Sequence, residues 1–177
     1  MPTHIGFLRA VNIGKRQYKT ADLKAALEGA GYTDVETHIQ TGNVRVTTPL
    51  RSCAKVEDAL EELFLADRGF EVVTMVFTPQ QVSQMAADTD DVAEKHGFEY
   101  GEYVTVLKRE PTAAIRKEVE ALSGDGERLV VRGRAVHMLY DVPYGTSKTG
   151  ARLEKIAGPG TNRNAKVIRA LAEKWGA

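Results

Sequence analysis

The sequence predicts an α+β protein made of two linked ferredoxin-like subdomains with antiparallel sheets and additional C-terminal helices. Strand and helix patterns follow the order βαββαβ through residue 77, which is the split βαβ arrangement of ferredoxin-like folds. A β-helix-β-β-helix succession begins again after residue 100. Between the two lies a polar stretch with little periodicity, so we place a linker at 88–100 between subdomains at 1–87 and 101–177.

Each helix and strand expected in the first subdomain is predicted from a local sequence pattern. Apolar and β-branched segments predict strands at 4–11, 34–38, 44–48 and 71–77. Thr20 and Ser52 each precede apolar residues at helical spacing, so we expect them to cap two helices that stop at Gly31 and Gly69. Both helices would then cover one face of an antiparallel sheet.

The second subdomain is expected to repeat most of this order. Thr78 and Pro79 begin a short linking helix that extends through Met85. Strands are then expected at 102–108, 127–132 and 135–140, with helices at 111–122, 147–157 and 161–175. The two strands of the hairpin are joined by a turn at Gly133.

Composition excludes several classes of function. The 177 residues include 24 basic and 24 acidic side chains, so the chain has no overall basic footprint for nucleic acid or an anionic membrane. No apolar run approaches the roughly 20 residues of a membrane span. Cys53 is the single cysteine, which excludes an internal disulfide, and we interpret it as packing rather than as a nucleophile. The four histidines lack ligand spacing, so we expect no metal and no cofactor. The single cysteine fits a reducing compartment, and the sequence shows no targeting segment, so we expect a cytoplasmic location.

A polar corner separates the second and third expected strands. It reads Gln40-Thr41-Gly42-Asn43, with a glycine that lets the backbone come close to another group. The two amides and the hydroxyl can both donate and accept hydrogen bonds. We therefore expect this corner to form one wall of a binding site.

The loop Gly158-Pro159-Gly160 precedes the last expected helix, which begins at Thr161. Arg163 and Lys166 would then lie in the first helical turn, where the helix dipole disfavours cations by about 0.3 to 1 kcal/mol each. A phosphate or carboxylate bound by Arg163 and the backbone N–H groups would remove this conflict. The alternative, that both cations are solvated and Thr161 only caps the helix, stays open.

The stretch 144–150 has the composition of a phosphate-binding loop but not its order. Ser147 and Lys148 can hold an anion at a helix start, or Ser147 can be an N-cap alone. Nucleophilic chemistry by this serine and lysine is not supported, because nothing indicates a desolvated lysine or an oxyanion hole.

A ferredoxin-like fold invites comparison with RNA-recognition domains, which stack bases on aromatic residues of the two central strands. The expected central strands contain only Phe7 in the first, and no aromatic residue at 44–48. The base-stacking platform is missing, so nucleic acid is a possible partner but not a favoured one.

Four separated motifs occur in order along the chain, namely 7–14 (FLRAVNIG), 39–44 (IQTGNV), 147–148 (SK) and 161–164 (TNRN). On these motifs the sequence resembles domain-of-unknown-function family 1697, a widespread bacterial group of small cytoplasmic proteins. The resemblance implies two ferredoxin-like subdomains and no established activity. The sequence departs from the family pattern at Ala10, where glycine is usual.

The motif residues are mainly cations, amides and hydroxyls without a convincing acid–base pair, a set that suits recognition of anions or nucleobase edges. We therefore predict a binding module for a phosphorylated or otherwise anionic ligand, such as a nucleotide, a metabolite or a nucleic-acid backbone, in a cleft between the subdomains. The candidate ligand-binding residues are Arg9, Asn12, Gly14, Gln40, Thr41, Gly42, Asn43, Ser147, Lys148, Thr161, Arg163 and Asn164.

The same residues are compatible with three alternatives. Several of these side chains can instead satisfy loop backbone. The protein can also be an enzyme that acts on a phosphoryl- or amide-containing small molecule, with Lys148 or His38 as the proton-transfer group. A third alternative is a protein-interaction module, and the sequence carries no signal for an oligomeric state.

Overall fold

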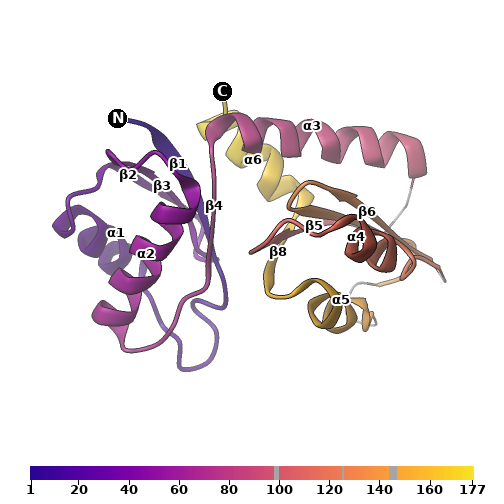
Figure 1. Cartoon of the computed structure of the whole chain (residues 1–177), viewed down its shortest axis with the longest axis horizontal. Coiled ribbons are helices and arrows are strands. Elements are labelled where there is room, and N and C mark those ends of the chain that lie inside the picture. The colour runs from indigo at the N-terminus through magenta and orange to yellow at the C-terminus, as the bar shows by residue number, and fades with distance from the viewer. Residues whose placement is uncertain (98–99, 125, 144–146) are drawn as a thin grey trace. The chain divides into compact units, whose positions relative to one another are not determined.

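The computed structural model describes residues 1–97, 100–124, 126–143 and 147–177. The chain forms two compact units, one made of Met1–Val82 with Lys174–Ala177 and the other of Ser83–Glu173. Each unit contains a four-stranded antiparallel sheet, and Figure 1 labels the elements except β7. The prediction of an α+β protein with two linked ferredoxin-like units is confirmed.

The first unit has the element order β1 (Thr3–Leu8), α1 (Thr20–Gly29), β2 (Thr33–His38), β3 (Asn43–Thr47), α2 (Cys53–Arg68) and β4 (Thr74–Phe77). Its strands are hydrogen-bonded in the order β2-β3-β1-β4. One face of the sheet and both helices share a core cluster, whose fully buried members include Leu27, Val44, Leu60 and Phe64. On each helix the buried apolar residues recur at helical spacing, which explains why both helices were predictable.

Local signals set the ends of these elements. Ser52 Oγ accepts a hydrogen bond from Lys55 N at 3.4 Å, and Gly69 ends α2 in the left-handed region at φ 76°. The expected cap at Thr20 is wrong, because the chain leaves its extended conformation at Lys19 and Thr20 is already the first residue of α1. Strand β1 ends before the predicted residue 11, because Ala10 has a left-handed φ of 54°.

Helix α2 also supplies acceptors for the backbone of β4, which lies at one edge of the first sheet. Glu57 Oε1 accepts from Val76 N at 2.8 Å, and Glu61 Oε1 accepts from Thr74 N at 2.9 Å. Glu57 is buried despite its charge. Both bonds cover N–H groups of an edge strand, which would otherwise invite pairing with another chain.

The second unit repeats the order as β5 (Gly101–Leu107), α4 (Ala113–Glu120), β6 (Glu127–Arg132), β7 (Ala135–Tyr140), α5 (Thr149–Ala157) and β8 (Gly160–Asn164). Its strand order β6-β7-β5-β8 corresponds to that of the first sheet. The hairpin has its predicted bounds, and Gly133 turns it at φ 57°. The edge strand β6 is covered in the same manner as β4, since Glu120 Oε1 accepts from Val131 N at 3.1 Å.

The prediction of a helix from Thr161 is wrong. Residues 160–164 form β8, which pairs antiparallel with β5 from Leu107↔Gly160 to Tyr103↔Asn164, and α6 begins only at Ala165. A Cβ on Gly160 would lie 2.7 Å from Val106 O, so glycine permits the close approach of the two strands. The open edge of β5 sets the conformation of this segment, and the second unit is thereby a complete copy of the βαββαβ order.

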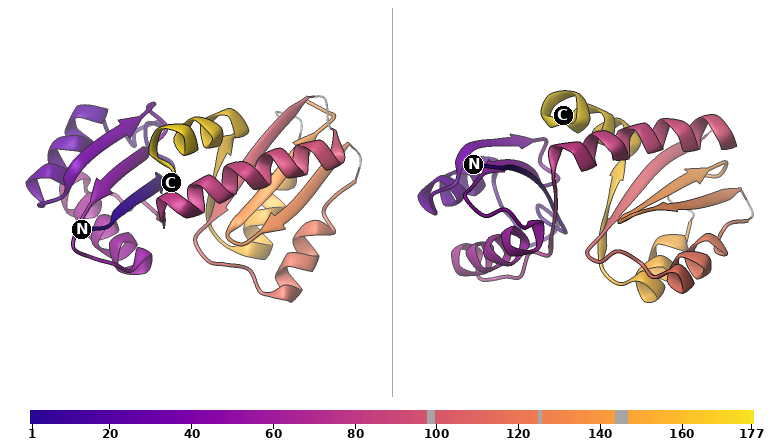
Figure 2. Two further views of the ribbon diagram at one scale, coloured as in Figure 1. Left: turned by 90° about the horizontal axis from the view of Figure 1, so that it is seen from above. Right: turned by 45° about the horizontal axis from the view of Figure 1, so that its top comes forward.

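Helix α3 (Pro79–His96) takes up most of the linker expected at 88–100. The predicted capping box is present, since Thr78 Oγ1 accepts from Gln81 N at 3.2 Å and Thr78 N donates to Gln81 Oε1 at 2.8 Å. The helix continues past Met85 because the buried residues Val82, Met85, Thr89 and Val92 follow one another at helical spacing. Within the second unit, α3 runs along the sheet face opposite α4 and α5 (Figures 1 and 2).

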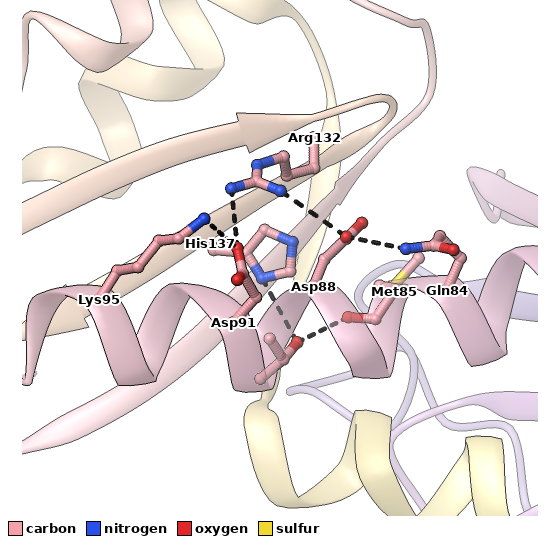
Figure 3. Close-up of polar contacts among 8 residues, drawn as sticks. Gln84, Met85, Asp88, Asp91, Lys95, Arg132 and His137 are labelled. Atoms are coloured by element: carbon pink, nitrogen blue, oxygen red, sulfur yellow. Dashed lines mark hydrogen bonds and ion pairs between the residues drawn. The ribbon is translucent and has the colours of Figure 1, made fainter.

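Charged residues of α3 contact the hairpin of the second unit. Arg132 on β6 lies 3.8 Å from Asp88 Oδ1 and 3.2 Å from Asp91 Oδ2, and Lys95 Nζ lies 2.9 Å from Asp91 Oδ2 (Figure 3). The aspartates that suggested a solvated linker therefore lie on a helix and pair with Arg132 of the hairpin. Their pairs are partly exposed, so each contributes little to stability, and the buried face of α3 carries most of the packing.

Beneath these pairs lies His137 on β7, which is 2% exposed. Its Nδ1 is 3.3 Å from Thr89 Oγ1, and that hydroxyl donates to Met85 O at 2.8 Å (Figure 3). Because the hydroxyl proton is used by Met85, Nδ1–H is the donor to Thr89 and Nε2 carries the lone pair. Among the described residues, His137 Nε2 has no hydrogen-bond partner.

Helix α6 (Ala165–Trp175) begins in the second unit, and its last two residues belong to the first. Arg169 pairs with Asp90 on α3 at 2.8 Å and with Glu102 on β5 at 2.7 Å. Trp175 is 5% exposed, and its Nε1 donates to Glu36 Oε2 at 3.0 Å. The end of the chain therefore contacts β2 in the unit with which the chain begins.

Candidate functional site

The predicted corner at 40–43 is built by the close approach of two loops in the first unit. Leu8 N donates to Gly42 O at 2.7 Å. A Cβ on Gly42, where φ is 87°, would lie 2.6 Å from Val11 Cγ2 and 2.8 Å from Leu8 Cβ. Glycine is required here, as expected, and the group that comes close is the protein's own first strand and the loop that follows it.

Two asparagines hold these loops together. Asn12 Nδ2 donates to Gln40 O at 2.7 Å, and Asn12 Oδ1 accepts from Tyr18 N at 2.9 Å. Asn43 is fully buried and donates to His38 O at 3.0 Å and to Thr41 Oγ1 at 3.1 Å. Both amides therefore satisfy loop backbone and loop side chains, which is the alternative that the sequence left open.

Backbone strain is concentrated at the same loops. Ala10, Asn12 and Ile39 have φ values of 54°, 58° and 50°. The left-handed region costs a non-glycine residue roughly 1 to 2 kcal/mol, and a β-branched residue such as isoleucine is rare there. Ile39 is 48% exposed, and Gln40 and Thr41 beside it are also exposed. The corner is thus a rigid, tightly bonded turn with an exposed tip.

The remaining first-unit candidates flank this turn. Arg9 is half-buried at the end of β1, and its backbone N–H donates to Val73 O at 2.9 Å. Gly14 turns the next loop at φ 56°. His38, considered for proton transfer, is half-buried, and its ring meets Trp175 edge-on with centroids 6.2 Å apart. The loop at 9–14 and the corner at 40–43, which belong to two of the four sequence motifs, therefore lie next to each other in the structure.

In the second unit, Thr161 and Arg163 occupy strand β8 instead of a helix start. Arg163 is 6% exposed, and its Nη1 donates to Thr161 Oγ1 at 2.8 Å and to Asn162 O at 2.9 Å. Burial lowers the pKa of Arg163 to about 10, so the guanidinium stays charged at neutral pH. Arg163 therefore does not lie in the first turn of a helix, and the prediction that it holds an anion there is wrong.

Ser147 and Lys148 precede α5. Ser147 Oγ accepts from Thr149 N at 3.2 Å, whereas Lys148 is the N-cap residue and is exposed. The helix was expected to begin at Ser147 and begins two residues later. The first residues of the glycine-containing stretch, 144–146, lie outside the described residues.

A pocket of about 310 Å³ lies where β5, β8 and the start of α6 meet, and we call it the α6 pocket. All of its lining residues belong to the second unit. They are Tyr100, Gly101, Glu102, Tyr103, Asn164, Ala165, Lys166 and Arg169. Of the predicted ligand-binding residues, Asn164 lines this pocket.

The α6 pocket combines aromatic rings with a cationic helix start. Tyr100 is 64% exposed, and Tyr103 is held edge-on against Tyr140 with ring centroids 5.8 Å apart. Asn164 Oδ1 accepts from Lys166 N at 2.9 Å, so Asn164 caps the helix through its side chain. The first turn of α6 contains no acidic residue. Aromatic rings and the N-terminal end of a helix that carries Lys166 therefore line one concave surface, together with the ion pair of Arg169 and Glu102.

A family profile described as "Protein of unknown function (DUF1697)" matches residues 1–137. The chain belongs to this family. This DUF1697 protein is also similar to the conserved bacterial protein SP0830 from Streptococcus pneumoniae, with a TM-score of 0.78 over 99% of this chain and 98% of that chain. Their sequence identity is 20%, so the likeness shows a shared fold. A search of curated proteins finds no match to the DUF1697 chain.

Sequence reasoning missed most of the α6 pocket in this DUF1697 protein. Tyr100 lies in the stretch expected to be a linker, Tyr103 lies in a strand that carried no motif, and Lys166 was assigned to the first turn of a longer helix. One signal was present, because a second βαββαβ unit requires a fourth strand before any further helix. Gly160-Thr161-Asn162 is also poor in helix-forming residues.

The described part of this DUF1697 chain contains neither a cluster of metal-binding side chains nor a membrane-spanning helix. Among those residues, no group of three or more histidine, cysteine, aspartate or glutamate side chains is placed to hold a metal ion. Within the same ranges, none of the helices combines the length and the apolar character needed to cross a membrane.

Proposed function

We propose that this DUF1697 protein binds an anionic ligand that carries an aromatic group, such as a nucleotide, in the α6 pocket. The proposal rests on one observation, the presence of an exposed tyrosine ring and a cationic helix start in the same pocket of about 310 Å³. It keeps the anionic ligand predicted from the sequence and places it at Asn164 and Lys166, because Arg163 is buried in β8.

The aromatic part of the ligand is assigned to Tyr100. Stacking of a base on an aromatic side chain contributes roughly 1 to 3 kcal/mol. Tyr100 is exposed and accessible for stacking, whereas Tyr103 is fixed against Tyr140 and gives the pocket a rigid wall. A rigid wall lowers the entropy cost of binding.

The anionic part of the ligand is assigned to the first turn of α6. Arg169 is already paired with Asp90 and Glu102, so its charge is compensated within the protein. Lys166 is exposed in the first turn, beside the positive end of the helix dipole. A phosphate group placed there would receive both the lysine charge and the dipole field.

The test is isothermal titration calorimetry of the protein with ATP and, separately, with inorganic phosphate. We expect Lys166→Gln to weaken both ligands by about tenfold, because a hydrogen bond to a charged group contributes roughly 1.5 kcal/mol or more. Tyr100→Ala should weaken ATP by about tenfold and leave phosphate unchanged, because phosphate has no ring to stack. Higher salt should weaken binding of both ligands.

Lys148→Gln is the matched control, since Lys148 is an exposed lysine at the start of another helix of the same unit. It should bind both ligands as the parent protein does. If Lys148→Gln lost binding while Lys166→Gln retained it, the anion would belong at α5 and the proposal would be wrong. Equal affinities of the parent and Lys166→Gln would also contradict it.

A further inference from the structure

The first unit contains a second pair of side chains that could take part in a reaction, a cysteine beside a buried histidine. Cys53 is the first residue of α2 and the only cysteine of the chain. His4 Nδ1 lies 3.7 Å from Cys53 Sγ. The register of the sheet produces this contact, because His4 on β1 pairs with Val46 on β3, shortly before the turn into α2. No spacing in the sequence indicates a pair so far apart.

The tautomer of the neutral imidazole follows from its other contact. His4 Nε2 lies 2.9 Å from Leu50 O, and the side chain is 1% exposed. A carbonyl oxygen only accepts hydrogen bonds, so Nε2 carries the proton and Nδ1 presents its lone pair to the thiol. A nucleophile, a base in contact with it and a third group that orients the base are the parts of an activated nucleophile.

The N-terminal end of α2 favours the thiolate of Cys53, and the carboxylate of Glu57, one turn further along the helix, opposes it. The first turn of α2 contains no acidic residue, and the positive end of the dipole of this 16-residue helix lies at Cys53. Arg51 and Lys55 are exposed cations close by in the chain. The side chain of Cys53 is itself only partly buried, so a reagent can reach it. Accessible cysteines at helix N-termini are among the reactive ones.

We propose that Cys53 is a reactive thiol, with His4 as its base, that exchanges with low-molecular-weight disulfides. The proton of Cys53 Sγ moves to His4 Nδ1, and the thiolate attacks one sulfur of the disulfide RSSR. The S–S bond of the reagent breaks while a bond forms between Cys53 Sγ and SR, and the leaving RS⁻ takes up the proton. Cys53 is oxidised to a mixed disulfide and one half of the reagent is reduced to RSH.

The test uses the reaction of the full chain with glutathione disulfide, followed by mass spectrometry, and the rate of alkylation by iodoacetamide between pH 5 and pH 10. The single cysteine makes every adduct assignable. In the folded protein we expect the midpoint of the alkylation profile at least about one pH unit below that of the same chain in guanidinium chloride, whose thiol has a pKa near 8.5. At pH 7 the folded protein should react roughly threefold faster, after allowance for the lower nucleophilicity of a less basic thiolate.

His4→Gln should return the midpoint of the profile toward that of the unfolded chain, because glutamine cannot accept the thiol proton as a base. His96→Gln, a histidine of the other unit, should leave the profile unchanged. The comparison of folded and unfolded parent protein needs no variant, so it decides the proposal even if His4→Gln fails to fold. Equal midpoints in the folded and unfolded chain, or a folded thiol that forms no adduct with glutathione disulfide, would overturn the assignment.

Discussion

Burial lowers the pKa of His137 from its ordinary 6.5 to about 4, with a further contribution from Arg132 and partial opposition from Asp88. The folded protein therefore keeps His137 neutral at pH values where the unfolded chain binds a proton. Stability is fully present above about pH 6.5, falls as the pH is lowered toward 4, and levels off below that value, because both states are then protonated. A shift of this size corresponds to at most about 3 kcal/mol.

We expect His137→Leu to remove this pH dependence. Leucine has a similar volume, lacks a titrating group and removes the buried Nε2 that has no partner among the described residues. The free energy of unfolding, measured by urea denaturation and circular dichroism, should drop by up to about 3 kcal/mol between pH 7 and pH 4.5 more in the parent than in the variant. The same drop in both proteins would show that His137 is not the group responsible.

Individual site residues illustrate what a local pattern can reveal. The need for glycine at position 42 was predictable, because a glycine between two strands indicates a tight turn. The roles of Asn12 and Asn43 were not, because an amide can serve a ligand or the backbone equally well, and only the observed partners decide between the two. The same holds for Cys53, whose base lies on a distant strand.

The edge strands β4 and β6 are each protected by glutamate side chains from a neighbouring helix. Glu57 and Glu61 cover β4, and Glu120 covers β6, in each case through a carboxylate that accepts from strand N–H groups. Acidic residues on an amphipathic helix suggest a solvated face when only the sequence is considered. Here the helix packs beside an edge strand, and the carboxylates complete the hydrogen bonding of the sheet.

Glu57→Ala should destabilise the protein by about 1 to 3 kcal/mol, because Val76 N loses its acceptor in a buried position. Glu57→Gln keeps a carbonyl oxygen at that place and should cost less than Glu57→Ala. Asp58→Ala, at the exposed neighbouring position, should have little effect. Urea denaturation of the three variants provides the measurement, and equal stability of Glu57→Ala and Asp58→Ala would contradict the proposed role of Glu57.

The chain as a whole consists of two units of the same βαββαβ kind, and each unit takes in residues from outside its own continuous repeat. The second unit includes most of α3, which follows the last strand of the first, and the first unit includes Lys174–Ala177 at the end of α6. Trp175 packs against β2 through Glu36 and His38. The stability of the first unit therefore depends on the last residues of the chain.

Trp175→Ala should destabilise the first unit by roughly 3 kcal/mol or more, as is typical when a buried tryptophan is truncated. Glu173→Ala, an exposed position on the same helix, is the matched control. Hydrogen exchange of the amides in β2 and β3 would localise the loss to the first unit. Unchanged protection of these strands in Trp175→Ala would refute a role for the C-terminus in this core.

The order of elements in the first unit, the presence of two ferredoxin-like units and the hairpin were accessible from the sequence, because hydrophobic periodicity, caps and turn glycines are local properties of the chain. Three features depended on contacts between distant residues. The strand β8 forms because β5 offers an open edge, α3 extends to His96 because its apolar side is buried, and the His4–Cys53 pair exists because sheet register brings the two together. These features are set by packing between residues that are far apart in the sequence, which overrides local propensity.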